Sequence, residues 1–366
     1  MYYQQKNIEL KFFISIVLAL IAVGLIFIYS ASSVFALERF GSSSYFVKKQ
    51  LIGVGLGCLF GLLAVMAPYN LIKRFSIVFF LASLILTALT LVPGLGIKIH
   101  GSSRWLRLPG LSFQPSELLK IGLILYVAHF LSRKKNTVSS FVKTYLPLIF
   151  MVGAALLILL IQPDFGLAVT LAVTVFSLLF IASFHQQYLF WSMLSLLPAA
   201  VILIAFKPYR LRRIMTFVNP WDDPQGAGFQ IIQSLIAVGS GGYCGNGISC
   251  SKQKFFYLPM QHTDFIFSII AEEVGFIGCA VIIGMFLSFV YFGIRIALQL
   301  KDDFATLASL GFIILISLQA TINLAVTTGL LPTKGIGLPF LSYGSSSILC
   351  LLIMIGLIIN FSQEAR

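Results

Sequence analysis

The sequence predicts an all-α, polytopic membrane protein, and three features support this fold class. Of the 366 residues, 58% are hydrophobic and 10% are charged, whereas soluble domains carry about 25% charged residues. The mean hydropathy is +0.98, and long apolar runs recur along the whole chain. A composition this poor in charge excludes a water-soluble enzyme, a disordered regulator and a secreted disulfide scaffold.

Ten apolar runs are candidates for membrane-spanning helices, which need about 20 residues each. They are continuously apolar rather than alternating, so they predict helices and not the strands of a barrel. The first run is too long for a signal-peptide core, and we expect it to be retained as a span. Residues 1–366 therefore form a single integral membrane domain. The predicted spans are 12–33, 51–68, 75–94, 117–132, 144–162, 167–184, 187–206, 268–297, 304–330 and 344–362.

The distribution of basic residues predicts the orientation. An even number of spans places both termini on one side, and with the N-terminus inside, the inner segments hold 11 Lys and Arg residues. The outer segments hold 13, of which six lie in one long outer loop, 207–263. Because long loops are not counted in the positive-inside rule, the bias favours cytoplasmic termini. The net charge of +13 points to anionic lipid headgroups or an anionic substrate, and not to nucleic acid.

Acidic residues at membrane depth are costly and usually mark a pathway or a site. Six of the 12 acids fall at span ends, and the proposed topology places all six on the outer side. This clustering is a strong functional signal. These acids are Glu38, Glu117, Asp164, Asp264, Glu272 and Glu273.

Two of these acids follow a Gln-Pro pair at the start of a span. In QPSELLK, Glu117 and Lys120 are three residues apart, so they share a helix face as a potential ion pair. In IQPDFG, Asp164 repeats the pattern. The alternatives are a packing pair for Glu117 and a helix cap for Asp164.

The long outer loop carries a basic cluster, YRLRR. Arg210, Arg212 and Arg213 would match the charge of a diphosphate, because guanidinium groups bind phosphate oxygens in pairs. A solvated or headgroup-bound charge run is the alternative. The following NPWDDPQGAGFQ is rich in turn residues, and its Asp222 and Asp223 are interpreted as exposed loop acids.

The five cysteines do not suggest a metal site. Cys58, Cys279 and Cys350 lie in predicted spans and are interpreted as small apolar fillers. Cys244 and Cys250 share the outer loop, and a disulfide between them and two free thiols both remain open.

The segment LPMQHTDFIFSIIAEEVGFIG carries Asp264 where the outer loop becomes the eighth span. Asp264, Ser268 and Glu272 are four residues apart, which places them on one helix face. Three polar groups on the same helix face suggest a solvated cavity. In such a cavity, partial burial and the nearby Glu272 carboxylate would raise the pKa of Asp264. A simple helix cap is the alternative for Asp264.

The ninth span carries a polar stripe, Gln319, Asn323 and Thr327, which we expect to face the bundle interior. It is followed by GLLPTKGIGLPFLSYGSSS, which contains Lys334. Irregular backbone at membrane depth is tolerated where it is buried or lines a wet cavity. We interpret this segment as a re-entrant, substrate-facing loop, and a plain outer turn is the alternative.

Five of these motifs, in this order, resemble the SEDS family (shape, elongation, division and sporulation), of which FtsW and RodA are typical members. The motifs are GSSRWLRLPGLSFQPSELLK, IQPDFG, NPWDDPQGAGFQIIQS, LPMQHTDFIFSIIAEEVG and PTKGIGLPFLSYG. The Trp of NPWDDP and the basic YRLRR are more similar to the division member, FtsW, than to the elongation member. One departure is Ser345, which stands where the family usually has a second glycine after SY.

The resemblance implies a peptidoglycan glycosyltransferase that polymerises lipid II at the outer face of the bacterial cytoplasmic membrane, at the division septum. It implies that Asp264 is the catalytic carboxylate and that a class B penicillin-binding protein transpeptidase and other division proteins are partners. No organic cofactor is expected, and Mg²⁺ or another divalent cation is a candidate. A lipid II flippase, a RodA-like enzyme of elongation and a non-catalytic scaffold are the alternatives. The expected substrate-binding residues are Arg104, Glu117, Lys120, Asp164, Arg210, Arg213, Glu272 and Lys334.

Overall fold

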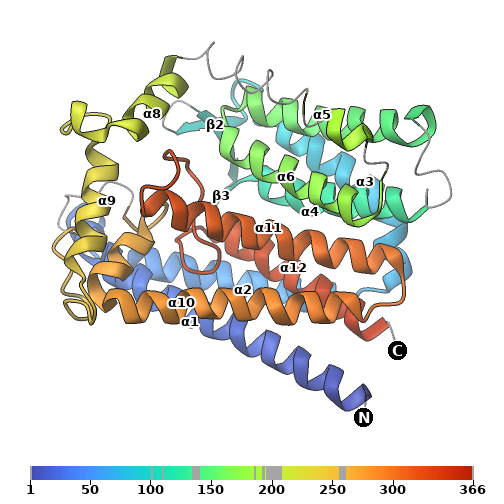
Figure 1. The fold of residues 1–366 in the computed structure, drawn as a ribbon, viewed down its shortest axis with the longest axis horizontal. Helices are drawn as coiled ribbons and strands as arrows, with labels where there is room; N and C mark the ends of the chain where they lie inside the picture. Colours follow the sequence, from blue (N-terminus) through green and yellow to red (C-terminus); the bar gives the residue numbers. More distant parts are fainter. Residues whose placement is uncertain are drawn as a thin grey trace.

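The computed structural model describes residues 2–99, 102–108, 111–133, 141–184, 187–191, 194, 208–254 and 261–364. The protein is a bundle of long helices with a small sheet and two short helices at one end (Figure 1). The helices are α1 Tyr2–Phe40, α2 Tyr45–Met66, α3 Tyr69–Leu89, α4 Pro115–Arg133, α5 Leu146–Ile161, α6 Phe165–Ile181, α8 Pro208–Val218, α9 Phe229–Ser240, α10 Ile266–Leu298, α11 Asp303–Thr327 and α12 Ser345–Glu364.

The predicted spans agree with these helices. Every predicted span except 187–206 overlaps a helix of the bundle. Six helices in the described part of the chain are long and apolar enough to cross a membrane, and α5 and α6 are shorter apolar helices. Residues 187–206 lie largely outside the described residues, so the total of ten stays a prediction.

Small residues let two helices of the bundle approach closely. Gly53, Gly57 and Gly61 recur every four residues on α2 and are buried. A Cβ at Gly57 would lie 2.7 Å from Leu352 Cδ1, and one at Gly356 would lie 2.3 Å from the Gly61 carbonyl oxygen. Such small-residue stripes are the usual contact between membrane helices, where packing replaces the hydrophobic effect. The stripe therefore fixes α12, and with it the loop that precedes α12, against α2.

Helix α4 runs through the middle of the bundle. Nearly all of its residues are buried, including Lys120 and His129, and it contacts α3, α6, α11 and α12. A helix that is apolar on all sides is expected at such a central position. Its N-terminus therefore places Glu117 and Lys120 inside the protein.

The helix α10 is broken at Gly275, which has φ 65° and ψ −166°. The turn 241–247 fills the break. Its N–H groups bond to the carbonyls of residues 272–273, and its own carbonyls accept bonds from the N–H groups of residues 276–277. A Cβ at Gly275 would lie 2.3 Å from a backbone nitrogen of this turn, so a side chain is excluded there. The break thus anchors the outer loop to α10.

A three-stranded antiparallel sheet, which the apolar pattern of the sequence does not predict, lies between α3 and α4 along the chain. Its strands are β1 Gly96–Ile99, β2 Ser102–Leu108 and β3 Leu111–Phe113, in the order β1-β2-β3. Arg104 and Trp105 are on the central strand. The sheet lies at the same end of the bundle as α8 and α9, whereas the start of α1 and the end of α12 lie at the opposite end (Figure 1). This arrangement agrees with an even number of spans.

Candidate active site

A cavity of about 630 Å³ lies at the sheet end of the bundle. Side chains from β2, α4, α6, the 261–265 turn, the 328–344 loop and α12 line it. Most of the predicted site residues meet here, although they come from distant parts of the chain. The predicted residues that line it are Arg104, Glu117, Lys120, Asp164, Arg213, Asp264 and Lys334.

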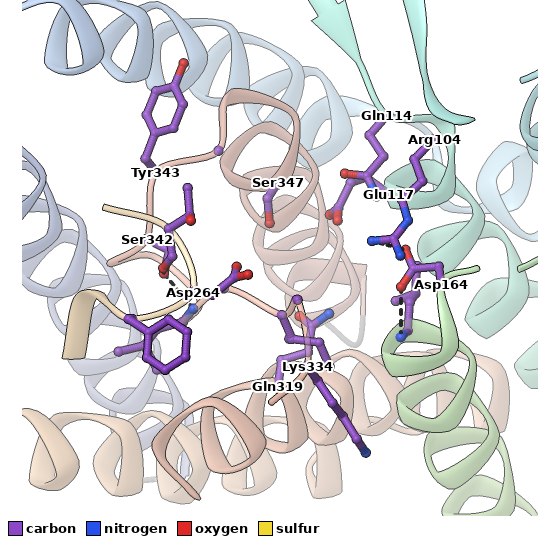
Figure 2. Close-up of a pocket in the computed structure, with 18 of the residues that line it drawn as sticks. Arg104, Gln114, Glu117, Asp164, Asp264, Gln319, Lys334, Ser342, Tyr343 and Ser347 are labelled. Atoms are coloured by element: carbon purple, nitrogen blue, oxygen red, sulfur yellow. Dashed lines mark hydrogen bonds and ion pairs between the residues drawn. The ribbon is translucent and has the colours of Figure 1, made fainter. Parts of the chain in front are cut away.

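Asp264 lies on one side of this cavity (Figure 2). It belongs to the turn before α10, and the N-cap position of α10 is taken by Phe265 without a side-chain capping bond. The cap interpretation of Asp264 is therefore wrong. Burial raises the pKa of the Asp264 carboxyl to about 6, while Arg104 and Arg213 lower it and Asp164 raises it further.

The backbone of the 328–344 loop passes directly beside this carboxylate. A Cβ at Gly335 would lie 3.5 Å from Asp264 Oδ2 and 4.0 Å from Arg104 Nη1. The Asp264 carboxylate and the Arg104 guanidinium therefore lie close to the same point of the loop. A residue without a side chain at position 335 keeps the space between them open.

Arg104 and Asp164 lie on the opposite side of the cavity (Figure 2). Asp164 is the N-cap of α6, where its Oδ1 accepts a bond of 3.3 Å from the Leu167 N–H, so the cap interpretation of Asp164 is confirmed. Its Oδ2 lies 3.6 Å from Arg104 Nη1. Arg104 also donates to the carbonyls of Gln162 and Pro163. Burial raises the pKa of Asp164, and Arg104 opposes this rise.

Glu117 and Lys120 form the ion pair that their spacing predicted. The distance from Lys120 Nζ to Glu117 Oε2 is 2.7 Å, and the Lys120 side chain is 1% exposed. Figure 2 shows Glu117 next to Gln114 and Arg104. Because the pair is buried, its two charges are held in fixed positions on the cavity wall, where a bound ligand would contact them.

Three further predicted cations have different positions. Arg213 of α8 donates to the Thr333 carbonyl at 3.2 Å, so it joins α8 to the loop. Lys334 lines the cavity, but its Nζ lies over the Phe165 ring, 5.9 Å from the centroid, and burial lowers its pKa. Arg210 is in α8, and its side chain lies outside the described residues.

The prediction that Glu272 shares the cavity with Asp264 is wrong. Ser251 Oγ donates to the Glu272 carboxylate, as do the N–H groups of Lys252, at 2.8 Å, and Gln253, at 3.4 Å. Asp264 precedes the first turn of α10, so it is not part of the helical face that the four-residue spacing assumed. The carboxylate of Glu272 instead closes the 251–254 segment onto α10.

Several uncharged residues complete the cavity and were not among the predicted site residues. Gln319 belongs to the polar stripe on α11, whose members are buried as predicted. The others lie inside motifs in which charged side chains give the stronger sequence signal, and uncharged amide and hydroxyl groups carry little signal of their own. The cavity-lining polar residues of this kind are Gln114, Gln319, Ser342, Tyr343 and Ser347 (Figure 2).

Other predictions concern residues away from the cavity. Among the described residues, all five cysteines are free, and Cys244 and Cys250 are exposed. Asp223 pairs with Arg212 at 3.2 Å near the surface, which fits an exposed loop acid. Glu38 is exposed on α1 and is not a lining residue.

Within the described ranges, no three His, Cys, Asp or Glu side chains lie together as a metal-binding group. Mg²⁺, however, is commonly held by one or two carboxylates and substrate phosphates, not by an all-protein cage. Glu117 and Asp164 both reach the cavity, so the residues present suit a cation that arrives with a diphosphate.

Comparison with known proteins identifies the family. Residues 10–366 match the family model named for FtsW, RodA and SpoVE and described as a cell cycle protein. The chain belongs to this family. It is the family that the five ordered motifs resemble, and its members include membrane proteins of the same fold.

The relatives extend over nearly the whole chain. A protein of Trichlorobacter lovleyi named probable peptidoglycan glycosyltransferase FtsW is 45% identical over 350 residues, which cover 96% of this chain and 92% of that protein. The stage V sporulation protein E of Bacillus subtilis is 41% identical, with 96% of each chain covered.

Solved structures of family members share the fold. A chain from a structure described as "Structural coordination of polymerization and crosslinking by a peptidoglycan synthase complex" matches with a TM-score of 0.80, 29% identity and 97% of both chains covered. The rod shape determining protein RodA of Thermus thermophilus matches with a TM-score of 0.71 and 26% identity, covering 97% of this chain and 96% of that one. The chain is therefore a multi-pass membrane protein with the architecture of this family.

Proposed function

We propose that this protein is a peptidoglycan glycosyltransferase that polymerises lipid II into glycan strands at the outer face of the bacterial cytoplasmic membrane. The observation that carries the proposal is the Asp264 carboxylate in a cavity of about 630 Å³, with cationic groups around it. The names of relatives that are 45% and 43% identical, peptidoglycan glycosyltransferases, support the same activity.

The proposed reaction is a single inverting displacement. The 4-hydroxyl oxygen of the acceptor sugar bonds to the anomeric carbon of the donor, the bond from that carbon to the diphosphate oxygen breaks, and the hydroxyl proton passes to Asp264. A carboxylate whose pKa is about 6 is mostly ionised at neutral pH and is a stronger base than an ordinary aspartate.

The cavity's cations suit the leaving diphosphate. Arg104 on β2 and Arg213 on α8 both stabilise the negative charge of the Asp264 carboxylate. An anion bound beside Asp264 is therefore attracted by both guanidinium groups. Guanidinium groups bind phosphate oxygens in pairs and remain charged. A Mg²⁺ ion, where bound, would add positive charge at the diphosphate; Glu117 and Asp164, which both line the cavity, are the residues that would hold it, so that Asp264 stays available as the base.

The proposed cellular context is division, at the septum, with both termini in the cytoplasm. Relatives named FtsW are 38–45% identical, whereas the RodA structure is 26% identical, which favours a division enzyme over a RodA-like enzyme of elongation. One matched structure is described as coordinating polymerisation with crosslinking in a synthase complex. A class B penicillin-binding protein transpeptidase and other division proteins are therefore the proposed partners.

A lipid II flippase requires groups that handle the headgroup across the whole membrane. The charged residues of the cavity gather at the sheet end of the bundle. At the other end, the ion pairs seen among the described residues join neighbouring elements of the bundle, as in Glu9 with Arg295 and Lys73 with Asp302. This distribution favours chemistry at one face over transport.

Asp264→Asn tests the proposal. The substitution keeps size and removes basicity, and loss of a general base costs about 10²–10⁴-fold in rate. Polymer formed from labelled lipid II by the purified protein with its partner should fall by this factor. Asp223→Asn, an exposed acid of the same outer segment, should leave the rate unchanged. Normal polymer from well-folded Asp264→Asn protein would defeat the assignment, and translocation without polymer would favour a flippase.

A further inference from the structure

The backbone around Asp264 is held by hydrogen bonds that three consecutive carbonyl groups accept. The His262 carbonyl accepts a bond of 2.9 Å from the Tyr343 N–H, and the Thr263 carbonyl accepts one of 2.6 Å from Ser342 Oγ. The carbonyl of Asp264 itself accepts a bond of 2.7 Å from Asn323 Nδ2. All three donors come from α11 or from the loop that follows it.

Two of these donors also bind the loop's own backbone. Asn323 Nδ2 donates a second bond, of 2.8 Å, to the Ile336 carbonyl. Ser342 Oγ accepts a bond of 2.7 Å from the Leu338 N–H. Asn323 therefore joins the Asp264 turn to the loop just before Gly337, and Ser342 joins the same turn to the loop just after it.

The chemistry of Asn323 is specific to this task. Both of its partners are carbonyl oxygens, which only accept hydrogen bonds, so the two N–H bonds of its amide are both used. Its Oδ1 is buried and has no hydrogen-bond partner within the described ranges. An ionised aspartate at this position would offer no donor, and a protonated one would offer a single O–H to the two carbonyls.

From these contacts we propose that Asn323 and Ser342 are positioning residues for the reaction, and this inference rests on the proposed function. They hold the loop backbone near Gly335 beside the Asp264 carboxylate, where a Cβ added at Gly335 would lie 3.5 Å from Asp264 Oδ2. Asn323 is 1% exposed and does not line the cavity, so it acts through Asp264 and the loop. A misplacement of about 1 Å in such a site can cost about 10²-fold in rate.

The chain contains a matched control for Asn323. Asn360, on α12, is also buried and also donates both N–H bonds to carbonyls, those of Val65 at 2.8 Å and Ala67 at 2.7 Å. Its Oδ1 likewise has no partner among the described residues. Asn360 joins the end of α12 to the end of α2, and α12 ends on the side of the bundle opposite the sheet (Figure 1). Asn360 therefore reports the structural cost of the same substitution.

The experiment compares Asn323→Asp with Asn360→Asp in the full-length protein with its transpeptidase partner. Both should lower the thermal midpoint by similar amounts. Only Asn323→Asp should lower kcat for labelled lipid II, by about 10²-fold with a smaller change in KM, and shift the acidic limb of the kcat–pH profile. The groups that act on Asp264 and would shape this limb are Arg104, Arg213 and Asp164, together with the cavity-lining Glu117, Lys120 and Lys334.

Equal kcat values for the two folded variants would overturn the proposal. Should Asn323→Asp fail to fold, Ser342→Ala is compared with Ser309→Ala, a buried control on α11. A kcat for Ser342→Ala at least tenfold below that of Ser309→Ala supports the positioning role. Equal kcat values overturn the positioning role. The parent protein and Asp264→Asn run in the same assay. An inactive parent or a fully active Asp264→Asn protein rejects the proposed function itself, whereas failure of the Asn323 comparison alone rejects only the positioning role.

Discussion

The two ends of the bundle each hold a carboxylate–cation pair at the same distance of 2.7 Å. At the cavity end, Lys120 pairs with Glu117, and its side chain is 1% exposed. At the other end, Arg295 pairs with Glu9, and the Arg295 side chain is 42% exposed. The distances are equal, so the difference in burial decides how much each pair contributes. An exposed cation keeps its hydration when its partner is lost, whereas a buried one does not.

The surroundings of the two pairs differ in the same way. Near the termini, Tyr69 and Lys73 of α3 both bond to Asp302, just before α11, and Gln299 donates to Glu9 at 2.6 Å. These charges join neighbouring elements. At the cavity end, the Glu117–Lys120 pair, the Arg104–Asp164 pair and Asp264 surround open space. One end therefore uses charge for packing, and the other presents charge to a ligand.

The largest expected difference concerns the removal of one partner. Glu117→Gln leaves the Lys120 ammonium buried without its carboxylate, and breaking a buried pair costs about 3–5 kcal/mol. The midpoint of thermal unfolding, measured in detergent, should therefore be clearly lower for Glu117→Gln than for the parent protein. The double variant Glu117→Gln with Lys120→Met removes both charges and should recover most of this loss. A single variant as stable as the parent protein would show that burial does not control this pair.

The second prediction concerns the pH dependence at the cavity. Because Asp264 must be ionised to act as a base and its pKa is about 6, the rate of polymer formation should fall about tenfold per pH unit below that value. Arg104 lowers this pKa, so Arg104→Gln should move the acidic limb of the kcat–pH profile to higher pH. A limb that does not move would show that Arg104 is not coupled to Asp264.

Stability should respond to the same carboxyl in the opposite direction. Its folded-state pKa, about 6, lies above the ordinary value of 3.8, so the folded protein binds the proton more tightly than the unfolded chain. The resulting stabilisation is fully present below about pH 4 and is lost as the pH rises through about 6. Asp264→Asn should remove this dependence, which thermal unfolding at several pH values would measure.

The smallest expected effect is at the other end of the bundle. Glu9→Gln leaves Arg295 at the surface of the bundle and keeps a polar group near Gln299, so the midpoint of thermal unfolding should fall much less than it does for Glu117→Gln. Polymer formation should stay at the parent rate. A loss as large as that of Glu117→Gln would remove the contrast between the two ends.

Local patterns in the sequence were sufficient for the helices and for much of the site. Continuous apolar runs predicted every described long helix of the bundle, and the i, i+3 spacing predicted the Glu117–Lys120 pair. The same rules failed at Glu272, because its spacing from Asp264 has meaning only within a helix, and Asp264 lies before α10 begins. They also missed the sheet, since three short strands between two spans carry little periodic signal.

The sequence by itself determined that this chain is a helical membrane protein of its family, with costly acids gathered at one side. That information is local, because hydrophobicity and helical spacing act within a few turns. Only the tertiary structure decided which acids face the cavity, that Asp164 is a cap and Asp264 is not, and that Asn323 holds the Asp264 carbonyl across a separation of 59 residues. These outcomes depend on where distant backbone donors and acceptors meet, and helix packing, not local spacing, sets those positions.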